Sequence, residues 1–307
     1  MDFMEFTQTI KEMAEVRCKE NDKVSLNRVP KNNGVFLQGL TISKKGRNIS
    51  PTIYLEEFYK EYQKGRSAED IVEEILFIYE EKTLQNSLDM DFFTEYDKAV
   101  ENIVFKLVNY EKNEELLADV PHVKYLDLAI VFLYLFRDHE IGNATILIHN
   151  NHLEIWEKTT EDLYEAACKN TPRLLKWELK GMEEILKELC AGDHFYDEEE
   201  AETDEECPDI HDDGEMYVLT NHERINGAGV ILYDSLLSRF AERKKKDIII
   251  LPSSVHEVIL LPCDDNQDKR MLMELVKEVN QTQVEAQEVL SDSVYLFSRK
   301  EQKVVCL

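Results

Sequence analysis

The chain has 307 residues, of which 43% are hydrophobic and 32% are charged. This balance predicts a folded protein with a sizeable core and excludes a disordered chain. Thirty-six Lys and Arg against 63 Asp and Glu give a formal net charge of −27. Such a charge repels phosphate backbones and anionic lipids, so we expect no direct binding to nucleic acid or membranes. Solvation is the simplest role of the acidic excess, and attraction of a basic protein partner is the functional one.

The sequence favours a cytoplasmic location. Residues 1–20 mix charges among apolar residues, unlike a signal peptide. The longest apolar run, from Leu128 to Phe136, is far shorter than the roughly 20 residues that a membrane-spanning helix needs. The cysteines are scattered without a close pair, which favours reduced thiols over disulfides or a zinc site. They are Cys18, Cys168, Cys190, Cys207, Cys263 and Cys306.

The first third of the chain is predicted to be mainly helical. Apolar residues at helical spacing indicate an amphipathic helix over residues 3–20. Asn33-Gly34 is a strong turn signal between β-prone runs, so we expect a hairpin with strands near 24–29 and 35–42. Further helices are expected from Pro51 to Gly65, over 67–82 and over 91–109.

The middle of the chain is predicted to contain a buried hairpin and then an acidic linker. A continuous β-prone run follows Asp127, and a second run follows Gly142-Asn143. Helices are expected over 160–169 and 181–190. Twelve of the nineteen residues from 197 to 215 are acidic, which predicts a disordered or solvated linker over 196–215. This linker would separate an N-terminal part, 1–195, from a C-terminal module, 216–307.

The C-terminal module has the clearest pattern. Its predicted elements follow the order β-α-β-β-α-β over residues 216–298, and a last strand follows at 303–307. This order matches the split βαβ arrangement, in which we expect two helices to bury one face of a sheet. The predicted fold class is therefore α+β, with a helix-rich N-terminal half that carries β-hairpins and a C-terminal split βαβ-like module.

Five sequence blocks together carry a family resemblance. They are NNGVFLQGLTI, ISPTIYLEEFY, MYVLTN, DIIILPSSVHEVILLP and LSDSVYLF. As a set they resemble an uncharacterised bacterial protein family, domain of unknown function 5688, over about residues 24–298. The resemblance implies a bacterial, cytoplasmic protein. It implies no activity, cofactor or catalytic residue.

The segment from Leu251 to Glu257 is the most suggestive of chemistry. Ser254 and His256 lie two residues apart on an extended chain and would project to the same side, as a nucleophile and its base do. No orienting acid, oxyanion hole or G-x-S-x-G elbow accompanies them. The structural alternative is a Pro-Ser-Ser turn whose hydroxyls cap backbone groups. The candidate catalytic residues of a hydrolase here are Ser254, His256, Glu257 and His222.

Three other motifs resemble ligand sites. Residues 209–214 resemble the start of an EF-hand loop, but Thr220 takes the place of the bidentate Glu. His149, His152 and Glu154 have the side chains of a zinc or iron site, but we interpret them as a surface hairpin tip. The Gly-containing segment 226–229 leads into a predicted helix, where a phosphate loop would lie, but a tight turn explains it. We predict no metal site, and no cofactor follows from the sequence.

With these charges and motifs, the sequence favours a non-catalytic intracellular binding or regulatory protein that engages a basic protein partner. The alternative is a hydrolase-type enzyme with a site formed by 220–226 and 252–257. A third hypothesis, mimicry of nucleic acid by the negative surface, predicts competition with DNA for a basic protein.

Overall fold

A computed structural model describes residues 1–18, 22–44, 50–82, 94–138, 142–191, 215–252, 254–264 and 268–307. The chain divides into two compact units. The N-terminal unit comprises Met1–Phe93 with Arg137–Ala144, and the C-terminal unit comprises Thr94–Phe136 with Thr145–Leu307. Helices are combined with antiparallel sheets, which confirms the α+β class. No helix in these ranges is long and apolar enough to cross a bilayer.

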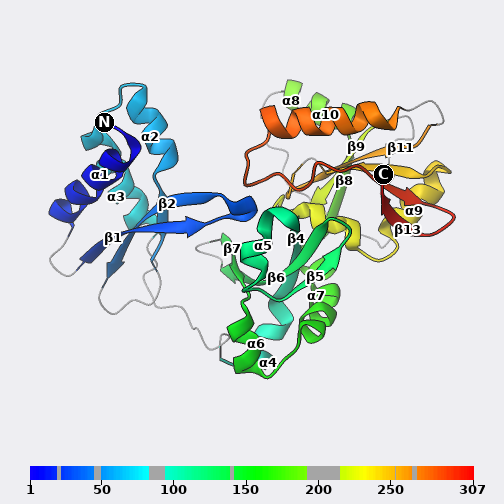
Figure 1. Ribbon diagram of the computed structural model, residues 1–307, viewed down its shortest axis with the longest axis horizontal. Helices are drawn as coiled ribbons and strands as arrows, with labels where there is room; N and C mark the ends of the chain where they lie inside the picture. Colours follow the sequence, from blue (N-terminus) through cyan, green and yellow to red (C-terminus); the bar gives the residue numbers. More distant parts are fainter. Residues whose placement is uncertain are drawn as a thin grey trace. The chain divides into compact units, whose positions relative to one another are not determined.

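The N-terminal unit is a three-stranded sheet, in the order β1-β2-β3, packed against helices (Figure 1). The predicted first helix and hairpin are confirmed, and a 3-10 turn that contains Asn33 and Gly34 joins the two strands. One apolar cluster holds the unit together, and it includes Phe6, Leu40 and Ile71 from the first helix, the sheet and the last helix. The elements are α1 (Phe3–Arg17), β1 (Asp22–Pro30), η1 (Asn32–Gly34), β2 (Phe36–Lys44), β3 (Thr52–Tyr54), α2 (Glu56–Gln63) and α3 (Ala68–Lys82).

The helix predicted from Pro51 to Gly65 is wrong in its first part. Thr52–Tyr54 is β3, and it pairs with β2 through Leu40 and Ile53. Helix α2 begins only at Glu56. Ile53 is buried in the sheet, so its apolar side chain serves a strand even though its spacing from later apolar residues also fits a helix.

The C-terminal unit contains a four-stranded sheet in which β6 is flanked by β4 and β5 and also pairs with β7. The predicted hairpin after Asp127 is confirmed as β6 and β7. The helices that precede and follow this sheet are short, except α7. The elements are α4 (Tyr96–Ala99), η3 (Val100–Asn102), β4 (Ile103–Asn109), η4 (Glu111–Asn113), α5 (Glu114–Leu117), β5 (His122–Tyr125), β6 (Leu128–Asp138), β7 (Gly142–Leu147), α6 (Asn150–Trp156) and α7 (Thr160–Leu174).

The helix predicted over 91–109 is wrong, because most of its second half is strand β4. Ile103, Val104 and Phe105 are consecutive and all buried, so both faces of this strand lie in the core. A strand that is buried on both faces lacks polar alternation, and its apolar residues also satisfy a helical pattern.

A second sheet of the C-terminal unit has the strand order β13-β12-β10-β11-β9-β8. Strands β9 and β10 are parallel with β11 between them, and β11 and β12 are parallel with β10 between them. Both βαβ units are therefore split, as predicted. The elements are β8 (Trp177–Gly181), α8 (Met182–Ala191), β9 (Tyr217–Asn221), η5 (Gly227–Leu232), α9 (Leu236–Lys244), β10 (Ile248–Leu251), β11 (Val258–Pro262), α10 (Lys269–Thr282), β12 (Tyr295–Ser298) and β13 (Lys303–Cys306).

The expectation that two helices cover one face of this sheet is wrong. Helix α10 packs through Val276 on the face that carries Ile249 and Leu261. Helix α9 packs on the opposite face, where Phe240 contacts Tyr217 with 5.2 Å between ring centroids. The connections β9-α9-β10 and β11-α10-β12 both run toward the β13 edge of the sheet, but the strands from which they start, β9 and β11, are antiparallel. Right-handed connections then place their helices on opposite faces.

The boundaries of the two compact units do not fall at the predicted linker 196–215. Most of that linker lies outside the described residues. Strand β8 precedes that segment, and β9 follows it. The two strands pair from Trp177 to Gly181, so residues on both sides of the segment belong to one sheet.

A polar network joins the two sheets of the C-terminal unit. Asp127, in the turn before β6, accepts hydrogen bonds from the hydroxyls of Ser291 at 2.5 Å, Ser293 at 3.0 Å and Tyr295 at 2.8 Å. Ser291 and Tyr295 are fully buried. One carboxylate therefore satisfies two buried hydroxyls and fixes the segment that leads into β12.

Candidate functional site

The predicted catalytic segment forms a turn between β10 and β11. The Ser254 Oγ accepts a hydrogen bond from the backbone N–H of His256 at 3.0 Å, and the Ser254 N–H donates to the Glu257 carbonyl at 3.2 Å. Ser254 is largely buried. Its hydroxyl thus caps a backbone group, as the structural alternative predicts.

The imidazole of His256 is also engaged. Its Nδ1 accepts a hydrogen bond from the backbone N–H of Asn226 at 3.2 Å, and its Nε2 lies 3.7 Å from Oε1 of Glu288. A base that activates a serine needs a ring nitrogen that accepts from the hydroxyl. Here one nitrogen accepts from the backbone and the other faces a carboxylate, so this arrangement gives the hydrolase alternative no support.

The segment after β9 closes on the same turn. The Thr220 hydroxyl donates to the His256 carbonyl at 2.7 Å, and the Asn221 side chain bonds both the N–H and the carbonyl of Ile225. The candidate residues His222 and Glu257 lie beside this junction; His222 is exposed, and its backbone N–H donates to the Lys176 carbonyl. Hydrogen bonds from Thr220 and Asn226 to His256 therefore bring segment 220–226 against the 254–257 turn.

Residues 227–229, predicted as a tight turn, are the first residues of the six-residue 3-10 helix η5, which Asn226 precedes. A Cβ on Gly227 would lie 2.2 Å from the Thr220 Oγ1 and 2.3 Å from the His256 carbonyl oxygen. The next two N–H groups are used within the protein, since Ala228 donates to the Val255 carbonyl and Gly229 to the Asn226 carbonyl. The protein itself therefore fills the space that a phosphate loop would leave to its ligand.

His149 and His152 lie at the start of helix α6 and not at a hairpin tip, so that interpretation is wrong. The Nδ1 of His149 lies 2.7 Å from Oδ2 of Asp119, and the His149 N–H donates to Nδ1 of His152 at 2.9 Å. Burial lowers the pKa of His152, and the nearby His149 lowers it further. No group of three or more metal-binding side chains occurs among the residues that the structure describes. The motif at 209–214 lies outside them.

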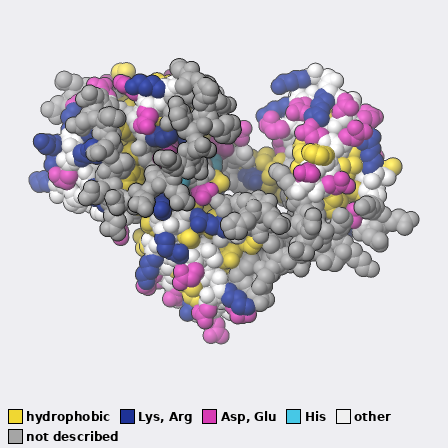
Figure 2. Space-filling model, turned by 180° about the vertical axis from the view of Figure 1, so that it is seen from behind, with side chains coloured by type: hydrophobic (Ala, Val, Ile, Leu, Met, Phe, Trp, Pro, Cys, Tyr) yellow, Lys and Arg dark blue, Asp and Glu magenta, His cyan; other side chains and the backbone are white. Residues whose placement is uncertain are grey.

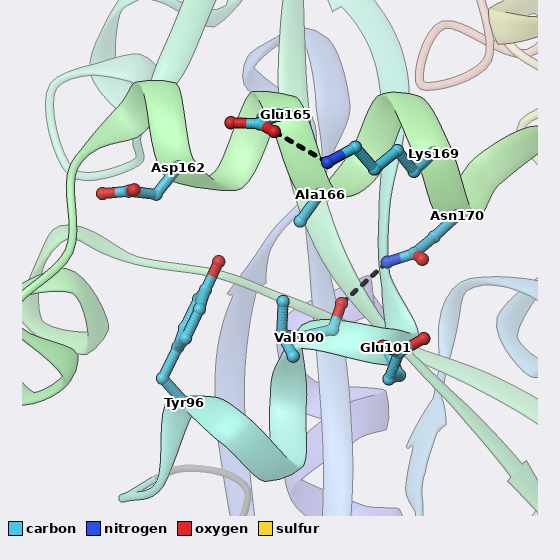
Figure 3. Close-up of a pocket in the computed structure, with 8 residues that line it drawn as sticks. All are labelled: Tyr96, Val100, Glu101, Asp162, Glu165, Ala166, Lys169 and Asn170. Atoms are coloured by element: carbon cyan, nitrogen blue, oxygen red, sulfur yellow. Dashed lines mark hydrogen bonds and ion pairs between the residues drawn. The ribbon is translucent and has the colours of Figure 1, made fainter.

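A cleft of about 280 Å³ lies between α4 with η3 and helix α7 (Figure 3). Sequence patterns did not indicate it, because its lining comes from segments about 60 residues apart in the chain. Figure 3 shows the Tyr96 ring standing along one side, with Asp162 and Glu165 above it on α7. The lining residues are Tyr96, Val100, Glu101, Asp162, Glu165, Ala166, Lys169 and Asn170.

The cleft has an acidic character. Three carboxylates and one ammonium group line it. Partial burial raises the pKa of Tyr96, and the charges of Asp162 and Glu165 raise it further. Hydrogen bonds from the backbone N–H and the hydroxyl of Thr159 lower the pKa of Asp162. At neutral pH the cleft therefore combines an uncharged phenol with three carboxylates, two of which pair with Arg173 and Lys169.

Comparison with known protein families supports the resemblance. The family of unknown function DUF5688 matches residues 3–299, nearly the whole chain. The chain belongs to the DUF5688 family. No curated protein and no solved structure matches it. Membership in DUF5688 assigns no reaction, so the geometry of the sites carries the functional argument for this chain.

We expect acidification to destabilise this DUF5688 protein through His152. In the unfolded chain His152 has its ordinary pKa of 6.5, above its folded-state pKa. Below about pH 6.5 the unfolded state therefore binds the proton first, and stability falls as the pH falls. Protonation would also put a hydrogen on Nδ1 of His152, which now accepts the hydrogen bond from the His149 N–H, so that two donors would face each other. Urea unfolding at about pH 7.5 and about pH 5.5 measures the loss.

His152→Gln is the matched control, because Gln at this position of a capping box also accepts from the backbone but does not titrate. The wild type should lose more stability on acidification than this variant. An equal loss in both proteins would exclude His152 as the source.

Proposed function

We propose that this chain is an intracellular, cytoplasmic, non-catalytic binding or regulatory protein that engages a basic protein partner. The observation that carries this proposal is the acidic cleft, in a chain whose acidic residues outnumber basic ones 63 to 36. Figure 2 shows acidic side chains on the described surface of both units. Such a surface attracts a cationic partner and accelerates its association.

The contacts of the candidate catalytic residues support binding over catalysis. Ser254 and His256 are joined to backbone groups and to Glu288, in positions where each stabilises a loop. A cytoplasmic location is supported by Cys18, Cys168 and Cys306, which are unbridged thiols.

The cleft suits the side chain of a lysine or arginine. Glu101 and Glu165 are held by Arg173 at 3.2 Å and Lys169 at 2.7 Å, so their carboxylates are oriented but stay at the surface. The Tyr96 ring already lies 4.8 Å from the ammonium of Lys158, which shows that a cation can approach its face. An incoming cation would meet an aromatic ring and carboxylates together.

We expect the cleft to contribute measurably to binding of an arginine-rich peptide. In Glu101→Gln/Asp162→Asn/Glu165→Gln, affinity for such a peptide should fall roughly tenfold at low salt, because exposed charge pairs contribute about 0.2–1 kcal/mol each. Calorimetric titration at about 50 mM salt, where screening is weak, is the measurement.

Glu115→Gln/Glu274→Gln/Glu278→Gln is the control, because it removes the same charge from exposed positions of the same unit. This variant should bind the peptide nearly as the wild type does. Equal losses in both variants would show that net charge, and not the cleft, attracts the peptide. Wild-type protein that does not bind at low salt would contradict the proposed function.

A further inference from the structure

The sheet of the N-terminal unit has a charge distribution opposite to that of the whole chain. Residues 23–55, which span most of β1 and all of β2 and β3, contain six basic residues and no acidic residue. The side chains of Lys23, Arg28 and Lys31 lie within the described part. Asp22, the first residue of β1, is the one acidic residue of the three strands, in a protein of net charge −27.

These three cations have no carboxylate partner among the described residues. The Arg28 guanidinium lies over the Phe36 ring, 3.8 Å from its centroid. The Lys31 ammonium lies 4.0 Å from the centroid of the Tyr54 ring and donates to the Tyr54 hydroxyl at 2.7 Å. Elsewhere in the chain, arginines such as Arg66 and Arg299 bind carboxylates. The charge of the hairpin therefore stays available to an external anion.

The strand register separates the face of the sheet that the described helices cover from the opposite face, which we call the open face. All three helices of the unit contribute to the core that includes Val24, Leu40 and Ile42, on one side of the sheet (Figure 1). Since neighbouring side chains alternate, the other face carries Lys23, Tyr54, the apolar Val29 and Leu37, and a set of hydroxyl and amide groups. These groups belong to Ser25, Asn27, Thr41, Ser43 and Thr52. The same alternation places Arg28 and Phe36 on the face of Val24 and Leu40.

We infer that this hairpin binds single-stranded nucleic acid along its open face and around its turn. Lys23 and Lys31 would contact phosphates, the hydroxyl and amide groups would donate to phosphate or sugar oxygens, and the Tyr54 ring would stack on a base. Strand β1 has nine residues and is about 30 Å long, enough for several nucleotides.

The net charge of the chain does not prevent this contact. It opposes nucleic acid at long range, but at physiological ionic strength charges more than about 8 Å apart are largely screened. The local balance at the hairpin then decides the sign of the interaction. This inference concerns a different unit from the acidic cleft and does not depend on the proposed protein partner.

Fluorescence anisotropy with a labelled oligonucleotide of about twelve thymidines tests the inference. We expect binding at about 50 mM salt and a linear fall of log affinity with log salt. Lys23→Gln/Lys31→Gln should bind roughly tenfold more weakly and should lower the salt slope by up to about 1.4, since each lost phosphate contact on a single strand contributes about 0.7.

Lys11→Gln/Lys60→Gln is the matched control, because it removes two cations from helices α1 and α2 of the same unit. It should keep wild-type affinity, and circular dichroism should show both variants folded. Wild-type protein without affinity at low salt would overturn the inference. Equal losses in both variants, or equal competition by polyglutamate or by duplex DNA, would also overturn it.

Discussion

Replacing Gly227 with alanine is expected to lower the free energy of unfolding by at least about 3 kcal/mol. A Cβ at this position would lie 2.3 Å from the His256 carbonyl oxygen and 2.9 Å from the Asn221 amide nitrogen. Both are backbone atoms of neighbouring strand ends, so neither moves without disturbing the sheet. Urea unfolding followed by circular dichroism measures the loss.

Gly181→Ala is the control, because no heavy atom lies within 4 Å of the position where its Cβ would stand. This variant should match the wild type or exceed it by less than about 1 kcal/mol. Adding Thr220→Ala to Gly227→Ala should not restore stability, because the backbone contacts remain. Gly227→Ala with wild-type stability would show that the junction of β9, η5 and the 254–257 turn adapts easily.

Asp127→Ala is expected to cost about 3 kcal/mol of stability. It removes the acceptor of three hydroxyl hydrogen bonds, and the hydroxyls of Ser291 and Tyr295 would be left in the core without that partner. Burial raises the pKa of Tyr295, and the charge of Asp127 raises it further, so its hydroxyl remains a neutral donor. Chemical denaturation is again the measurement.

Ser293→Ala tests whether the loss in Asp127→Ala reflects the whole network or a single hydrogen bond. It deletes one hydroxyl and leaves Asp127 with Ser291 and Tyr295, so a loss of about 1 kcal/mol is expected. Asp127→Asn should fall between the two variants, because its amide retains one oxygen acceptor. Equal costs for Asp127→Ala and Ser293→Ala would show that the carboxylate adds little beyond one contact.

Elements with a strong local signal could be predicted from the sequence. Asn33-Gly34 marked the first hairpin, and the β-prone runs on either side of Gly142 marked the second. Strand β4 could not be recognised, because burial on both faces depends on α7 and β6, which lie far along the chain. Strand β8 was missed for a similar reason, since its partner β9 follows 36 residues after it in the chain.

The candidate sites show the same limit. Thr220 and Asn226 contact His256, and the end of β9 and the turn before β11 meet at one edge of the sheet, a proximity that strand order suggests. The atoms that bind the His256 ring were not predictable, since Asn226 and Glu288 reach it from opposite directions along the chain. Asp119 likewise meets His149 from 30 residues away.

The pairing of β8 with β9 has a consequence for fragments of this protein. A cut within residues 196–215 would divide the chain between two neighbouring strands of one sheet. The upstream fragment would carry β8 without the strand with which it pairs, and the downstream fragment would expose the free edge of β9. Because the two pieces share backbone hydrogen bonds, they are complementing halves and not independent domains.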